Sequence, residues 1–110
     1  RRLVAGPGRV LGAFGIGPGE RVLEIGPGTG YYSVAAARIV GPAGRLVGLD
    51  VQREMLQAAR RRASGAGQSA DFVQGDALRL PFRAGSFDHV FLVTVLGELP
   101  ARPSLVWPSD

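Results

Sequence analysis

The stretch that most constrains this chain runs from Arg21 to Gly30 and reads RVLEIGPGTG. It begins with an apolar run that is too short for a helix but is typical of a buried parallel strand. Glycines then follow at every second position, namely Gly26, Gly28 and Gly30. This pattern predicts a strand, a tight turn and the start of a helix. Backbone N–H groups at such a turn can be approached closely by a nucleotide-like ligand.

The spacing of the glycines separates two kinds of nucleotide cofactor. A dinucleotide-binding G-x-G-x-x-G turn needs a small third residue, but position 31 is Tyr31. The chain instead reads E-x-G-x-G-x-G, and its acidic residue, Glu24, belongs to the strand. A carboxylate there suits the cationic end of an amino acid better than a pyrophosphate. The pattern therefore disfavours an NAD-dependent Rossmann domain, which is kept as the least favoured alternative.

The motif from Glu24 to Gly30 resembles the first motif of the class I S-adenosylmethionine-dependent methyltransferases. The resemblance implies that the cofactor is S-adenosylmethionine. It also implies that the acidic residue and the three glycines hold the methionine part of that cofactor.

Acidic residues also follow the next two predicted strands. Asp50 ends the strand 45–49 and stands twenty residues after Gly30, a spacing typical of a carboxylate that accepts hydrogen bonds from ribose hydroxyls. The alternative makes Asp50 the N-cap of the next helix. Asp76 follows the strand 70–74, and the resemblance implies a contact with adenine, whereas the alternative is an ordinary turn aspartate. The expected cofactor-binding residues are Glu24, Gly26, Gly28, Gly30, Asp50, Val51, Asp76, Ala77 and Thr94.

A second resemblance concerns the stretch from Leu80 to Asp88, in which an L-P-F turn leads to S-F-D at the start of a strand. It is similar to the small-molecule methyltransferases of ubiquinone and menaquinone biosynthesis, and implies a small-molecule substrate. No catalytic residue or general base is identified. His89, the only histidine, begins the fourth strand at the edge opposite the ligand, so we expect a structural role for it.

The order of elements predicts an α/β fold with a Rossmann-like, mainly parallel sheet, helices on both faces and the strand order 3-2-1-4. Thr29 is the expected cap of the second helix, and Met55 an expected core residue of the third. The domain is expected over 1–99, followed by an irregular tail with three prolines over 100–110. The predicted helices cover 7–14, 30–40 and 51–64, and the predicted strands cover 22–25, 45–49, 70–74 and 90–93.

Four strands are fewer than the seven of the resembled family, so the chain corresponds to the cofactor-binding half of that fold. The apolar fourth strand becomes a sheet edge, which favours self-association or pairing with a partner chain. Two functional classes stay open. One is a methyltransferase or its cofactor-binding half, and the other is a truncated, non-catalytic cofactor-binding module or partner subunit.

Composition excludes several other classes. The chain has no cysteine and one histidine, which argues against a protein metal site and suits a reducing cytoplasm. The net charge of +4 comes from arginines that are not interleaved with aromatic residues, so we expect no nucleic-acid partner. The longest apolar run, near 90–97, is far short of the roughly 20 residues that span a bilayer, so we expect no membrane partner.

Overall fold

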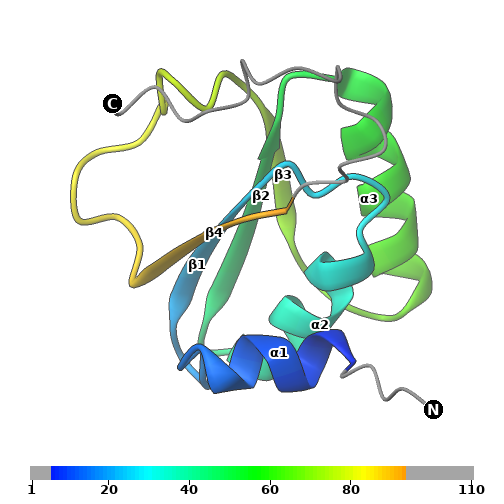
Figure 1. Cartoon of the computed structure of the whole chain (residues 1–110). Coiled ribbons are helices and arrows are strands. Elements are labelled where there is room, and N and C mark those ends of the chain that lie inside the picture. Colours follow the sequence, from blue (N-terminus) through cyan, green and yellow to red (C-terminus); the bar gives the residue numbers. More distant parts are fainter. Residues whose placement is uncertain (1–5, 94–110) are drawn as a thin grey trace, which may run out of the picture.

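The computed structural model describes residues 6–93, which form a four-stranded sheet and three helices (Figure 1). All strand pairings are parallel, and the strand order is β3-β2-β1-β4. The predicted sheet and its order are therefore confirmed. Thr94 and the expected tail 100–110 lie outside the described residues. The strands are β1 (Arg21–Ile25), β2 (Arg45–Asp50), β3 (Asp71–Gln74) and β4 (His89–Leu92), and the helices are α1 (Pro7–Ala13), α2 (Tyr31–Val40) and α3 (Arg53–Gly65).

The centre of the sheet is β1, which pairs with β2 on one side and β4 on the other. In this register Glu24 stands opposite Gly48 of β2 and Phe91 of β4. The interior of β1 and β2 is buried, as expected for parallel strands with near-continuous apolar runs. The carboxyl ends of β1, β2 and β3 consequently meet at one edge of the sheet.

The three helices form one layer, because α2 packs against both α1 and α3 (Figure 1). One buried cluster joins α1 and α2 to the sheet, and a smaller cluster joins α3 to Phe72 of β3. Because Phe72 and Phe91 lie on the face of the sheet that carries Glu24, all three helices cover that face. The buried members of the larger cluster are Leu11, Ile16, Val22, Ala35, Ala36, Ala37, Val40 and Leu46.

The opposite face is covered in part by the loop from β3 to β4 rather than by a helix. Phe82 and Phe87 of this loop stack edge to face at 5.0 Å and pack over the buried residues Leu23, Val47 and Leu49. Glycines and Pro81 interrupt the loop, so it cannot continue as a helix. We expected helices on both faces of the sheet. Within the described residues, helices cover one face and the loop from β3 to β4 covers part of the other.

The fourth strand lies at the edge of the sheet, as the sequence predicted. The side chains of Val90 and Leu92 remain 55% and 48% exposed, respectively. At the start of this strand, Asp88 accepts hydrogen bonds from the backbone and side chain of Arg21, and His89 Nε2 lies 2.9 Å from Glu20 Oε1. These contacts place His89 at the amino edge of the sheet, away from the glycine turn.

Two local predictions about the helices are wrong. Thr29 does not cap α2; the N-cap is Gly30, whose φ of 91° is in the left-handed region that favours glycine. A Cβ at Gly30 would lie 3.0 Å from Ala59 Cα, so this glycine also lets the start of α2 approach α3. On α3 the buried residue of the first turns is Leu56, which shares the buried face with Ala59 and Ala63, and Met55 beside it is only partly buried.

Within residues 6–93, the longest helix is α3, and none of the helices has the length and apolar character needed to cross a bilayer.

Candidate functional site

The turn after β1 depends on its glycines. Gly26, Gly28 and Gly30 have φ angles of 74°, 60° and 91°, which side chains rarely adopt. The N–H of Gly26 donates to the carbonyl of Leu49 at 2.8 Å, which ties the turn to the end of β2. A Cβ at Gly26 would lie only 2.9 Å from the carbonyl oxygen of Val93. The turn therefore presents bare main chain at the carboxyl edge of the sheet.

A cavity of about 160 Å³ lies at this edge, where β1, β2 and β3 end. It brings together four of the residues predicted to bind the cofactor: Gly26, Asp50, Val51 and Ala77. Ligands of open α/β sheets bind outside the carboxyl ends of the strands, so the location is the expected one. The cavity is lined by Ile25, Gly26, Leu49, Asp50, Val51, Gly75 and Ala77.

The carboxylate of Asp50 is held by the chain that follows it. Its Oδ1 accepts a hydrogen bond from the backbone N–H of Gln52 at 2.9 Å. Gln52 is the N-cap residue of α3, so Asp50 is not the helix cap that the alternative interpretation required. A carboxylate offers about four acceptor positions, and one bond to Gln52 leaves acceptors for a ligand in the cavity.

Asp76 has the geometry of a turn aspartate. Its Oδ1 accepts from the N–H of Leu78 at 2.9 Å, and its carbonyl accepts from the N–H of Arg79 at 3.0 Å. The side chain is exposed and does not line the cavity. Its contact with adenine stays a prediction, as do the roles of Gly28 and Gly30, which lie in the turn but outside the cavity wall.

Glu24 is fully buried under the turn rather than on the cavity wall. The hydroxyl of Ser33, in the first turn of α2, donates to Glu24 Oε1 at 2.5 Å. Glu24 Oε2 has no hydrogen-bond partner among the described residues. Burial raises the pKa of Glu24 to about 7, and the hydrogen bond from Ser33 opposes part of that rise. The carboxyl is therefore present in both protonation states near neutral pH.

Three residues of this region were not predicted from the sequence. Ser33 is one of them, because a serine inside a helix has no distinctive spacing. Gln74 donates through Nε2 to the carbonyl of Val51 at 2.9 Å and so ties the end of β3 to that of β2. Gly75 lines the cavity, and a Cβ there would lie 2.7 Å from Leu49 Cδ1. Its position just before Asp76 was the feature of the sequence that could have identified Gly75 as a site residue.

A second cavity, of about 290 Å³, lies between α1, the start of α2 and the end of β4. Its lining is apolar and aromatic, and the rings of Tyr32 and Phe91 meet edge to face at 6.4 Å. Val93 belongs to this lining and also places its carbonyl against Gly26, so the cavity borders the glycine turn. The lining residues are Val10, Leu11, Phe14, Tyr32, Phe91, Leu92 and Val93.

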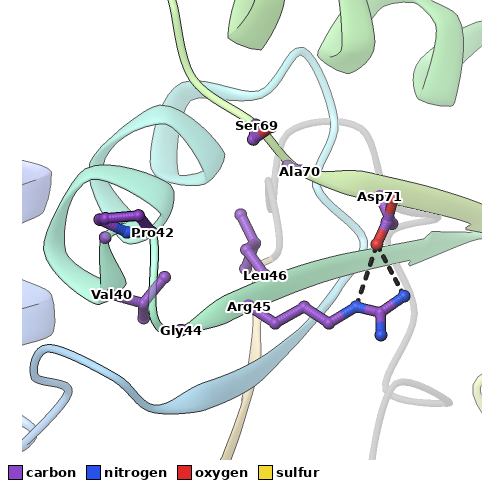
Figure 2. A pocket seen from close by; sticks show the side chains of 9 residues that line it. Val40, Pro42, Gly44, Arg45, Leu46, Ser69, Ala70 and Asp71 are labelled. Atoms are coloured by element: carbon purple, nitrogen blue, oxygen red, sulfur yellow. Dashed lines mark hydrogen bonds and ion pairs between the residues drawn. The ribbon is translucent and has the colours of Figure 1, made fainter.

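A larger cavity, of about 400 Å³, opens at the other edge of the sheet, near the start of β2 and β3 (Figure 2). Arg45 and Asp71 form an ion pair of 2.8 Å beside it, and both side chains are more than half exposed. The amino ends of parallel strands are not where such sheets bind nucleotides. The smaller cavity at the glycine turn is therefore the candidate cofactor site.

Comparisons with known proteins agree with this geometry. A family model described as a methyltransferase domain matches residues 22–106. The demethylmenaquinone methyltransferase of Staphylococcus aureus is 33% identical over 92 residues, which are 84% of this chain and 38% of that protein. The chain thus spans less than half the length of this curated relative.

Solved structures give the same result. A SAM-dependent methyltransferase from Aquifex aeolicus has a TM-score of 0.73 and 29% identity, over 78% of this chain and 46% of that one. The O-methyltransferase TomG from Streptomyces achromogenes, solved in complex with SAM, has a TM-score of 0.64 and 32% identity, over 82% of this chain and 44% of TomG. Since the family model matches most of the chain, this chain belongs to the methyltransferase domain family.

Proposed function

We propose that this chain is the cofactor-binding part of an S-adenosylmethionine-dependent methyltransferase that acts on a small-molecule acceptor. The observation that carries the proposal is the cavity at the glycine turn, where Gly26 and Asp50 converge in a chain of the methyltransferase domain family. When bound, S-adenosylmethionine supplies a methyl group that its sulfonium already activates. The protein then contributes mainly alignment of two reactants and exclusion of water.

The residues of the site divide according to the part of the cofactor that they suit. The bare main chain of the glycine turn accommodates the methionine end, with the Glu24 carboxyl beneath it. Asp50, held by Gln52, accepts hydrogen bonds from the ribose. Val51 and Ala77 form the wall on the adenine side, with Asp76 as the acceptor for the adenine amine. Thr94, which lies outside the described residues, completes the proposed set.

The apolar cavity under α1 is the proposed acceptor side. It borders the glycine turn through Val93, and Phe14, Tyr32 and Phe91 line it with aromatic rings. Such a lining favours a flat, weakly polar acceptor over a charged one. The name of the Staphylococcus aureus relative, a demethylmenaquinone methyltransferase, supports an acceptor of that kind.

We expect Asp50→Ala to weaken the binding of S-adenosylhomocysteine about ten-fold or more, because each charged hydrogen bond to the ribose contributes about 1.5 to 3 kcal/mol. Calorimetric titration measures the change. Asp71→Ala is the matched control, because it removes a carboxylate at the opposite edge of the sheet and should leave the affinity unchanged. An unchanged affinity in folded Asp50→Ala protein would exclude the ribose contact.

The alternative function is a non-catalytic cofactor-binding module or partner subunit. One observation favours it: the edge strand β4 exposes Val90 and Leu92. An exposed apolar edge strand can pair with a second chain, and self-association or a completing partner through β4 is part of this alternative. Cofactor binding without methyl transfer would support it. A cytoplasmic location stays a prediction.

A further inference from the structure

The Glu24 carboxyl, which pairs with Ser33, is a buried polar group with few hydrogen-bond donors around it. Glu24 is fully buried with one hydrogen-bond donor on Oε1 and none from the described residues on Oε2. A buried carboxylate with so few donors is costly, since an ionised group must be paired or solvated to be stable. The same carboxyl is tolerated easily when it is protonated. The folded chain thus favours the neutral form of Glu24 up to a pKa of about 7, and a positive charge on the turn above it would favour the ionised form.

No charged side chain in the described part of the chain supplies that positive charge. The register partners of Glu24 are Gly48 on β2 and Phe91 on β4, and neither can carry charge. On α2 the titratable side chains are Tyr31, Tyr32 and Arg38; Tyr31 and Arg38 are exposed, and Tyr32 packs against the core cluster.

The charged groups of the other elements are engaged elsewhere or exposed. His89, on the same face of β4, is paired with Glu20. Arg60 of α3 lies over the ring of Phe72 and donates to its carbonyl, and Arg9 of α1 is exposed. The pKa of Glu24 accordingly reflects burial and the Ser33 hydroxyl, without a contribution from a charged neighbour.

We propose that cofactor binding at the glycine turn is coupled to the release of one proton from Glu24, and that Ser33 is the positioning residue that sets the pH at which this release occurs. The proposal rests on the proposed function, because the positive charge that favours ionised Glu24 is the ammonium group of the methionine end, bound on the glycine turn above the buried carboxyl. In this step the O–H bond of the neutral carboxyl breaks and its electron pair stays on Glu24. The proton passes to the solvent buffer, and the carboxylate stays ionised beneath the turn that would hold the ammonium group.

Ser33 acts through Glu24. Its hydroxyl donates to Oε1 and so stabilises the carboxylate over the acid. Without that donor, the carboxyl holds its proton to higher pH, and binding must overcome a larger cost at neutral pH. A side chain that only supported the packing of α2 would change cofactor affinity by the same factor at every pH.

Titration calorimetry with S-adenosylhomocysteine, which keeps the ammonium group, counts the released protons in two buffers of different ionisation enthalpy. With a pKa of about 7, we expect release of about 0.8 proton at pH 6.5 and about 0.1 at pH 8. The apparent affinity should be about ten-fold weaker at pH 6 than at pH 8, because only the ionised fraction is competent.

Four variants separate the explanations. Glu24→Gln should release no proton and lose the pH dependence, while Glu54→Gln, an exposed carboxyl in the first turn of α3, should behave as the unmodified chain does. Ser33→Ala should move the rise in affinity to higher pH, and Ser33→Thr, which restores a hydroxyl, should move it back.

Equal proton release in Glu24→Gln and the unmodified chain would overturn the proposal, as would tight binding with no proton release at pH 6.5. In both cases the ligand binds and the proposed function stands. A failure to bind S-adenosylhomocysteine at any pH would instead contradict the proposed function itself. Should Glu24→Gln fail to fold, the proton count of the unmodified chain and the pH shift in Ser33→Ala still decide the question.

Discussion

The free energy of unfolding should fall by about 3 kcal/mol more in the unmodified chain than in Glu24→Gln as the pH rises from 4.5 to above 7. The folded chain holds the Glu24 proton up to a pKa of about 7, whereas the unfolded chain releases it near 4.5. The folded state therefore binds more protons within this window, and raising the pH favours unfolding. The stabilisation from this carboxyl is complete below about pH 4.5 and is lost as the pH passes through about 7.

Urea unfolding at a series of pH values measures this difference. Other groups, such as Asp88, whose pKa the hydrogen bonds from Arg21 lower to about 2, are present in both proteins and cancel in the comparison. The glutamine amide cannot ionise, so its cost or benefit is constant with pH. Parallel curves for the two proteins from pH 4 to pH 8 would show that Glu24 titrates normally and that its burial has no such consequence.

Gly26→Ala should destabilise the fold by roughly 2 to 5 kcal/mol, the sum of a left-handed backbone and a steric clash. The φ of Gly26 is 74°, and the new Cβ would lie 2.9 Å from the carbonyl oxygen of Val93. Because Val93 also lines the apolar cavity, relief of the clash would move the turn away from the end of β4. Cofactor affinity should consequently fall together with stability.

Gly28→Ala is the matched control for the steric clash between residue 26 and Val93. Gly28 has a φ of 60°, but no atom of the described chain lies within 4 Å of a Cβ built there. The control should therefore cost only the backbone term, about 1 to 2 kcal/mol. Equal loss of stability in Gly26→Ala and Gly28→Ala, measured by thermal unfolding, would mean that the approach to Val93 is unimportant.

The sheet was predictable because its strands are short apolar runs bounded by glycines and acidic residues. The run before Gly26 could be only a buried strand, and parallel strands connected by helices leave few possible orders. The strand order β3-β2-β1-β4 brings Gly26, Asp50 and Ala77 together at the carboxyl edge of the sheet. The residues of the cavity could be predicted because the topology alone brings the ends of parallel strands together, whichever contacts their side chains make.

The contacts of individual side chains were less predictable. Thr29 has the chemistry of a helix cap, but the turn needs a left-handed residue at the N-cap position, and Gly30 takes that place. The burial of Glu24 against Ser33 depends on how deeply α2 sits on β1, which no local pattern encodes. The layer of helices on a single face depended on the loop from β3 to β4, whose proline and glycines were visible in the sequence but whose path was not.

The most direct test of the central claim is calorimetric titration of the 110-residue chain with S-adenosylhomocysteine, with NAD titrated in parallel. The glycine turn, the Asp50 carboxylate and the cavity between them predict binding of S-adenosylhomocysteine at about micromolar Kd, or about 8 kcal/mol, and no binding of NAD. Binding of NAD in preference to S-adenosylhomocysteine, or binding of neither by the folded chain, would contradict the assignment of this edge of the sheet as a methyltransferase cofactor site.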